Sequence, residues 1–124
     1  MPKGHETVLV VEDNDLVLDL VAEMMKDLGY EVLTAVDARS ALWIIEHDDH
    51  IQLLFTDVMM PNHMNGIDLA RAAKRRRPDL KVLLTSGYAA FGPAADGGAE
   101  FPVLPKPYRR GELARRVRAT LDGS

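Results

Sequence analysis

The residues best suited to chemistry are acids that stand directly after apolar, strand-like segments. Residues 8–11 run into Glu12 and Asp13, and residues 53–56 run into Asp57. Short apolar runs of this kind are typical of buried strands, so an acid just past the run is expected at the rim of a sheet. If the two strands are parallel neighbours, all three acids meet at one edge.

Carboxylates that lie close together repel each other. Two of them about 4 Å apart repel by about 4 kcal/mol at an effective dielectric constant of about 20, so the group must take up a proton, a cation or a lysine. The chain offers Lys106 after the apolar segment 103–104, and the hydroxyl of Ser86 after segment 82–84. Three acids, one hydroxyl and one lysine are therefore expected at the carboxyl ends of strands.

Length and composition narrow the class of protein. With 124 residues the chain is predicted to be one domain, covering 1–124. A net charge of −4 argues against a nucleic-acid surface, and the lack of cysteine excludes disulfides, thiolate metal sites and thiol nucleophiles. No apolar run approaches the roughly 20 residues of a membrane span, and the first residues lack the apolar core of a signal peptide. A soluble, cytoplasmic protein is predicted.

Strand-like and helical segments alternate along the chain. Asn14 and Asp37 are placed to cap helices, Gly29 is placed to end one, and a helix is expected after Gly66. The helix after Asn14 is expected to bury the apolar residues that recur at helical spacing, which are Val17, Val21, Met24 and Leu28. The segment 88–100 contains glycine and proline and predicts a short or irregular fourth helix. The expected strands are 7–11, 31–35, a segment ending at 57, 81–85 and 101–104.

This alternation predicts a fold of the α/β class. Five β–α units imply a parallel sheet with helices on both faces, because right-handed crossovers place them there. In such sheets ligands bind beyond the carboxyl ends of the strands, where the strand order reverses. Alternation alone does not set the strand order.

The chain resembles the receiver domain of two-component response regulators, the chemotaxis-regulator type, from residue 8 to residue 121. Each motif is weak alone, but their order and spacing together are specific. The resemblance implies a flavodoxin-like (βα)5 fold with strand order 2-1-3-4-5. The motifs are LVVED at 9–13, FTDVMMP at 55–61, NG at 65–66, LTSG at 84–87 and KP at 106–107.

The resemblance also assigns a metal site. Asp57 corresponds to the family's phosphorylated aspartate, and Glu12 and Asp13 to the acidic pair that holds Mg²⁺ or Mn²⁺. Met59 corresponds to the residue whose backbone carbonyl binds the same ion. Oxygen ligands of this kind are the ones that Mg²⁺ prefers.

Two further residues complete the implied site. Ser86 corresponds to the hydroxyl residue that contacts the phosphoryl group, and Lys106 to the lysine beside it. The peptide bond between Lys106 and Pro107 is expected to be cis, as in the family. Phosphorylation of Asp57 would draw the Ser86 hydroxyl towards the phosphoryl group and bias the following loop.

The implied function is that of a phosphoacceptor signalling domain and not of a conventional enzyme. The phosphoryl group would come from a phosphohistidine on a histidine kinase or a histidine phosphotransfer domain. No nucleic acid and no membrane are expected as partners of this domain, and the sequence does not indicate an oligomeric state.

Departures from the family's pattern concern the output face. Val103 stands where an aromatic residue is usual, three positions before Lys106, and the fourth helical segment is interrupted. That segment, with Tyr88 after the serine motif, most resembles receivers attached to hybrid histidine kinases. Met59 and Tyr88, each two residues past a site residue, are expected to obstruct water and prolong the life of the phosphoryl group.

Two alternatives belong to other classes. A metal-dependent phosphohydrolase would need a second acid two residues after Asp57, where the chain has Met59, which cannot act as general acid or base. A non-phosphorylated interaction module of the same fold would not need the acids, Ser86 and Lys106 together.

Other conspicuous residues have simpler interpretations. The histidines at 47, 50 and 63 match no zinc spacing and are expected to be solvated loop residues. Residues 74–77, a basic run, are interpreted as a solvated helix end. Trp43 and Phe91 are candidate partner anchors, although core or half-buried surface is the commoner role for a tryptophan.

Overall fold

The computed structural model of the chain describes residues 2–59, 65–86 and 101–123. In these residues a five-stranded parallel sheet has the order β2-β1-β3-β4-β5, and four helices cover its two faces. The predicted fold class and strand order are confirmed, whereas the predicted fourth helix lies outside the described residues. The strands are β1 (Thr7–Val11), β2 (Glu31–Ala35), β3 (Ile51–Asp57), β4 (Lys81–Ser86) and β5 (Val103–Pro105). The helices are α1 (Asp15–Asp27), α2 (Ala38–His47), α3 (Gly66–Arg76) and α5 (Arg110–Leu121).

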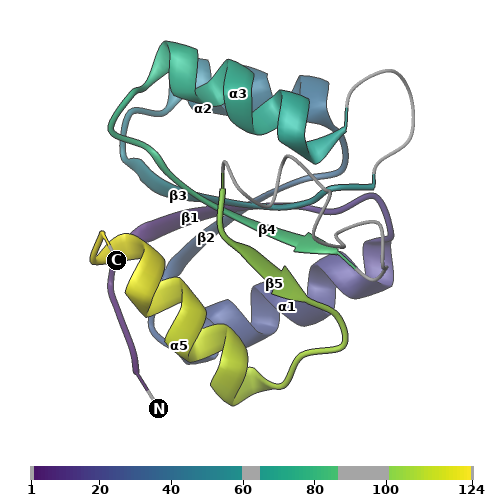
Figure 1. The fold of residues 1–124 in the computed structure, drawn as a ribbon, viewed down its shortest axis with the longest axis vertical. Coiled ribbons are helices and arrows are strands. Elements are labelled where there is room, and N and C mark those ends of the chain that lie inside the picture. Colours follow the sequence, from purple (N-terminus) through teal and green to yellow (C-terminus); the bar gives the residue numbers. More distant parts are fainter. Residues whose placement is uncertain (1, 60–64, 87–100, 124) are drawn as a thin grey trace.

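The sheet separates two apolar cores. Helices α2 and α3 pack on one face and α1 and α5 on the other, as Figure 1 shows. Strands β1 and β3 lie in the middle of the sheet and are buried on both faces, which explains their continuous apolar runs. No helix in the described part of the chain has the length and apolarity to cross a membrane.

The predicted caps at Asn14 and Asp37 and the predicted helix end at Gly29 are confirmed, and Asn65 is a further cap that was not predicted. The side chains of Asn14, Asp37 and Asn65 each accept hydrogen bonds from backbone N–H groups in the first turn of α1, α2 and α3. Gly29 follows the end of α1 with φ of 99°, a left-handed conformation that suits glycine. These short-range signals set where each helix begins and therefore where each strand ends.

The buried face of α1 is wider than the predicted one. Val21 and Leu28 are buried as expected, and Leu18 and Met25 are buried as well. Val17 and Met24 are only partly buried beside that core. Apolar residues occur on several sides of this helix, so its periodicity did not single out one face.

The basic run 74–77 closes α3, and its interpretation as a solvated helix end is wrong for Arg77, which is partly buried. Arg76 is exposed, as predicted. Arg76 pairs with Glu46 of α2 at 2.5 Å. The guanidinium of Arg77 donates to three backbone carbonyls in the connection between α2 and β3. It thereby satisfies polar groups that the turn leaves unpaired. The carbonyls are those of Asp48 at 3.2 Å, Asp49 at 3.1 Å and Ile51 at 2.6 Å.

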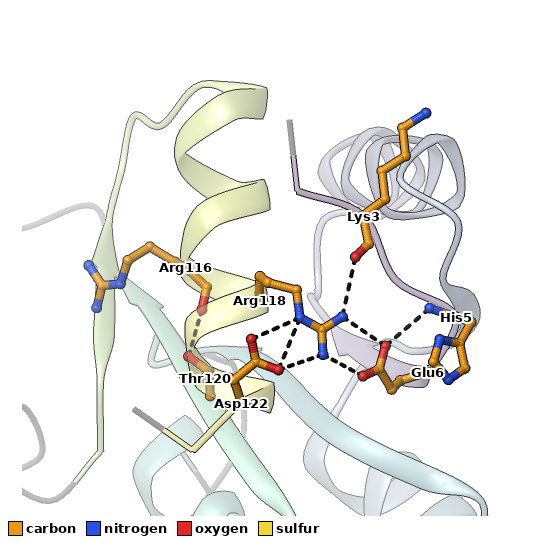
Figure 2. Close-up of polar contacts among 7 residues, drawn as sticks. All are labelled: Lys3, His5, Glu6, Arg116, Arg118, Thr120 and Asp122. Carbon is orange, nitrogen blue, oxygen red and sulfur yellow. Dashed lines mark hydrogen bonds and ion pairs between the residues drawn. The ribbon is translucent and has the colours of Figure 1, made fainter.

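A second arginine fastens the N-terminal segment to α5 (Figure 2). Arg118 donates to both carboxylate oxygens of Glu6, at 3.1 and 2.5 Å, and to the Lys3 carbonyl at 3.3 Å. The same guanidinium also pairs with Asp122 at 2.9 Å. Bidentate arginine–carboxylate pairs are among the stronger polar contacts in proteins.

This pair predicts a specific loss of stability in acid. The hydrogen bonds from Arg118 lower the pKa of Glu6 from 4.5 to about 2. A carboxyl group whose pKa is lowered by folding stabilises the fold at pH values above its pKa in the unfolded chain. The stabilisation from Glu6 is therefore complete above pH about 5. It is lost as the pH falls from about 4.5 to about 2, and amounts to about 2–3 kcal/mol.

Urea unfolding at pH 7 and pH 3 would measure this effect. Glu6→Gln should be less stable than the wild type at pH 7, and the difference should shrink at pH 3. Glu23→Gln, at an exposed position on α1, is the matched control and should behave like the wild type. Equal losses of stability from Glu6→Gln at both pH values would contradict the assignment.

Candidate functional site

The strand register brings the predicted residues to one edge of the sheet. Asp57 is the last residue of β3 and pairs with Thr85 of β4, while Ser86 pairs with Pro105 of β5. The N–H of Lys106 donates to the Ser86 carbonyl at 2.8 Å. Backbone pairing thus joins the ends of three neighbouring strands at this edge.

Lys106 lies between two carboxylates. Its Nζ is 2.6 Å from Asp57 Oδ2 and 3.6 Å from Glu12 Oε2. The remaining oxygens are also held, since Asp57 Oδ1 accepts from the Met59 N–H at 3.0 Å and Glu12 Oε1 from the Asn14 N–H at 3.1 Å. The expected meeting of Glu12, Asp57 and Lys106 is therefore present.

The site residues differ in exposure. Glu12 and Asp57 are each 6% exposed and Ser86 is 3% exposed, whereas Asp13 is open to solvent and Met59 is 62% exposed. The site is thus a buried carboxylate pair with an accessible side, where an ion or an incoming group can approach.

Burial and crowded negative charge both affect the pKa of Glu12. Burial raises the pKa of Glu12 to about 7, and the neighbouring carboxyls of Asp13 and Asp57 act in the same direction. The Asn14 N–H and the charge of Lys106 act against this rise. The raised pKa of Glu12 and the positive charge of Lys106 both reflect the crowding of carboxylates at this edge.

Lys106 remains the cation of the site. Burial acts to lower the pKa of its ammonium, but hydrogen bonding and attraction from Asp57 and Glu12 raise it above its ordinary value. The Lys106–Pro107 peptide bond is cis, as predicted.

Gly66 contributes to the site in a way that the sequence analysis missed. Its N–H donates to the Val58 carbonyl at 2.9 Å, and a Cβ at this position would lie 2.2 Å from the Asp57 carbonyl oxygen. Only glycine lets α3 begin so close to the backbone of Asp57. The Asn-Gly pair at 65–66 was the available signal, but it was used only as a family motif and as the start of a helix.

Tyr108 is a second residue that the sequence analysis missed. Its ring packs edge-on against Phe55 with centroids 6.3 Å apart. Burial raises the pKa of its hydroxyl, and the charges of Glu12 and Asp57 add to the rise. Tyr108 therefore forms an apolar wall close to the carboxylates.

An apolar groove leads away from Lys106 along α1. Its volume is about 400 Å³, and its lining comes from α1 and from the residues that follow β5. Leu16 and Leu20, on the same helix, are 80% and 60% exposed. The lining residues are Val17, Leu20, Val21, Met24, Lys106, Pro107 and Tyr108.

A separate group of possible metal ligands lies at the other end of β3. Asp48, Asp49 and His50 have ligand atoms within 4.8 Å of one another. His50 is solvated and pairs with the two acids at 3.5 and 3.4 Å, in keeping with its predicted loop role. This group contains none of the predicted site residues.

Several predictions fall on residues that the structure does not describe. They concern Tyr88 and its effect on phosphoryl lifetime, Phe91 as a partner anchor, and His63 as a loop histidine. The described residues place Met59 beside Asp57, but they do not test the predicted lifetime of the phosphoryl group.

Comparison with known proteins gives consistent relatives. The chain is 36% identical over 122 residues to the sensor kinase CckA of Brucella abortus (strain 2308), covering 96% of this chain and 13% of that protein. It is 31% identical over 116 residues to the response regulator receiver protein CpdR of the same organism, covering 92% of this chain and 95% of that protein. The chain thus spans only a small part of the kinase.

A solved structure and a family match agree with these relatives. A response regulator receiver domain protein from Clostridium thermocellum superposes with a TM-score of 0.86 at 25% identity, over 94% of each chain. Residues 8–118 match the response regulator receiver domain as a family. The match includes every predicted site residue, and the chain belongs to the response regulator receiver domain family.

Proposed function

We propose that this chain is a single phosphoacceptor domain of a two-component phosphorelay, in which Asp57 accepts the phosphoryl group. The observation that carries the proposal is the Asp57 carboxylate, 6% exposed, with Lys106 Nζ 2.6 Å from one oxygen. A buried carboxylate next to a fixed cation is suited to hold a transferred anionic group. The phosphorus–nitrogen bond of a phosphohistidine breaks as the bond from phosphorus to an Asp57 oxygen forms.

A divalent cation fits the donor set. Glu12, Asp13 and Asp57 offer carboxylate oxygens, and Met59 offers a backbone carbonyl in the same segment. Burial raises the pKa of Glu12 to about 7 and the carboxyls of Asp13 and Asp57 add to the rise, so a cation held by these acids would be favoured. Bound Mg²⁺ or Mn²⁺ would supply positive charge that offsets the carboxylates and the incoming phosphoryl group.

The chain's own residues supply the remaining interactions. Lys106 would place its positive charge on the phosphoryl oxygens, and the hydroxyl of Ser86 would donate a hydrogen bond to them. Catalysis is then positioning and neutralisation of charge, as in phosphoryl transfer generally. The backbone hydrogen bond from Lys106 to Ser86, at 2.8 Å, would couple the positions of these two residues.

The phosphodonor would be a histidine kinase or a phosphotransfer domain in the cytoplasm. The lack of cysteine fits a reducing compartment, and the net charge of −4 does not favour nucleic acid. The domain would assist its own phosphorylation and dephosphorylation, without turning over a free substrate as an enzyme does.

Mass measurement after incubation with acetyl phosphate and Mg²⁺ tests the proposal. The chain should gain the mass of one phosphoryl group, and chelation of the metal should prevent the gain. Continuous release of phosphate from a phosphate ester, with many turnovers per chain, would instead favour the phosphohydrolase. No mass gain and no turnover would favour the non-phosphorylated interaction module.

The groove beside Lys106 predicts where the protein donor docks. Leu20 lines this groove and is 60% exposed, so its side chain is available to a partner that delivers a phosphohistidine to the adjacent Asp57. Leu20→Asp should slow transfer from a phosphorylated donor domain by about tenfold or more, the usual effect of losing a central apolar contact.

The control separates docking from chemistry. Leu20→Asp should leave the rate with acetyl phosphate unchanged, because this small donor does not need the groove. Trp43→Asp, an exposed apolar position on the opposite face of the sheet, should leave both rates unchanged. If Leu20→Asp slowed both donors equally, the groove would not be the docking surface.

A further inference from the structure

The outer edge of β2 is open in the described part of the chain. This strand ends the sheet and pairs only with β1 among the described residues. Sheet edges are usually guarded by lysine, proline or a bulge, because unpaired backbone groups invite another strand. The segment 31–36 contains neither lysine nor proline, and its single charged residue, Glu31, stands at the start of the strand. The edge is therefore able to accept a second strand.

An exposed tryptophan stands over this edge. Trp43 of α2 is 60% exposed, and its ring stacks on His47 with centroids 4.1 Å apart. It forms a wall of two hollows of about 520 and 430 Å³. The larger hollow runs from α2 onto the middle of β2, where it is lined by Val32, Leu33 and Thr34. Large exposed aromatic groups beside apolar hollows are typical of interfaces.

The charges at the two ends of α2 are opposite. Arg39 lines the hollow near the start of the helix, and Asp48 lines the hollow at its end. Trp43 lies midway between them in the sequence. A twofold axis that passes beside the middle of α2 would therefore place positive charge against negative charge twice.

We infer that this face binds a second copy of the chain. Strand β2 pairs antiparallel with β2 of the partner subunit around Leu33, which joins the two sheets into one. The same axis sets the two α2 helices side by side, so that Trp43 enters the hollow over the partner subunit's β2. Arg39 then faces Asp48 of the partner subunit, and the reverse contact follows by symmetry.

A second copy fits better than an unrelated strand because the surface is complementary to itself. The open edge, the tryptophan with its hollow and the paired charges are all centred near the same point, between Leu33 and Trp43. An isologous interface needs this arrangement, whereas a foreign peptide does not. The inference uses no residue of the phosphoacceptor site and is independent of the proposed function.

Sedimentation equilibrium over a range of concentrations tests the dimer. The wild type should show a concentration-dependent dimer, and Trp43→Lys should raise the dissociation constant by about tenfold or more. Trp43 is the chain's single tryptophan, so its fluorescence emission should shift to the blue as the wild type associates. A wild type that stays monomeric throughout would overturn the inference. So would a dimer that Trp43→Lys does not weaken.

Charge reversal tests the orientation of the two copies. Arg39→Asp and Asp48→Arg should each weaken the dimer, because each sets like charges opposite one another twice. An equimolar mixture of the two variants should associate more tightly than either alone, since both contacts in the mixed dimer are then complementary. Asp49→Arg is the matched control at a neighbouring exposed acid. Failure of the mixture to recover would exclude the antiparallel arrangement, and circular dichroism would verify that every variant is folded.

Discussion

Asp57→Asn should show no increase in mass after incubation with acetyl phosphate and Mg²⁺ under conditions that phosphorylate the wild type completely. The amide nitrogen and oxygen are far weaker nucleophiles than a carboxylate. The substitution also removes one of the charges expected to hold the cation. The loss should therefore be complete, the largest effect expected of any single substitution in this chain.

The variant should remain folded. Asp57 lies beside Glu12 in a crowded acidic site, and loss of one charge relieves the repulsion that contributes to the raised pKa of Glu12. Asp19→Asn, at an exposed position of α1, is the control and should be phosphorylated like the wild type. An equal gain in mass by Asp57→Asn and the wild type would remove Asp57 as the acceptor.

Lys106→Met should slow phosphorylation by about 10²–10³-fold, the range typical when one preorganised electrostatic contact is removed. The ammonium is 2.6 Å from Asp57 and 3.6 Å from Glu12, so no other cation in the described part of the site replaces it. Methionine keeps much of the side chain's length and apolar packing, which limits the change to the loss of charge.

The same variant should depend more strongly on added metal. Without the lysine, Glu12 and Asp57 repel each other with less compensation, so Mg²⁺ should raise the midpoint of urea unfolding more than it does for the wild type. Lys26→Met, on the exposed side of α1, is the matched control. Wild-type phosphorylation rates in Lys106→Met would contradict the role of this charge.

The sequence predicted the site at the carboxyl ends of the strands well, because the signals for this site lie in short stretches of the chain. An apolar run that stops at an acid marks both the strand and the place where its side chain emerges, and parallel pairing brings Glu12, Asp57, Ser86 and Lys106 to one edge. The caps at Asn14 and elsewhere depend on contacts within a few residues. For these features, spacing in the chain is nearly equivalent to spacing in the fold.

The remaining features depend on contacts between distant segments. Arg77 was interpreted as a solvated end because nothing nearby in the sequence shows that three carbonyls more than 25 residues earlier need donors. Gly66 was not recognised as support for Asp57, since only the folded backbone reveals how closely the two approach. The burial of Leu18 and Met25 on α1 was not predicted, because apolar residues occur on several sides of this helix and only packing selects which of them are fully buried.

The side-chain contacts of Arg77 and Arg118 lie at the opposite end of the sheet from the carboxylates. Arg118 holds the segment that precedes β1, and Arg77 holds the segment that precedes β3, so both act where strands enter the sheet. Neither contact involves the loops at the exit side, so substitutions in those loops leave both arginine contacts in place. The contacts that hold the strand entries are therefore separated by the length of a strand from the loops on which a different anion-binding site could be engineered.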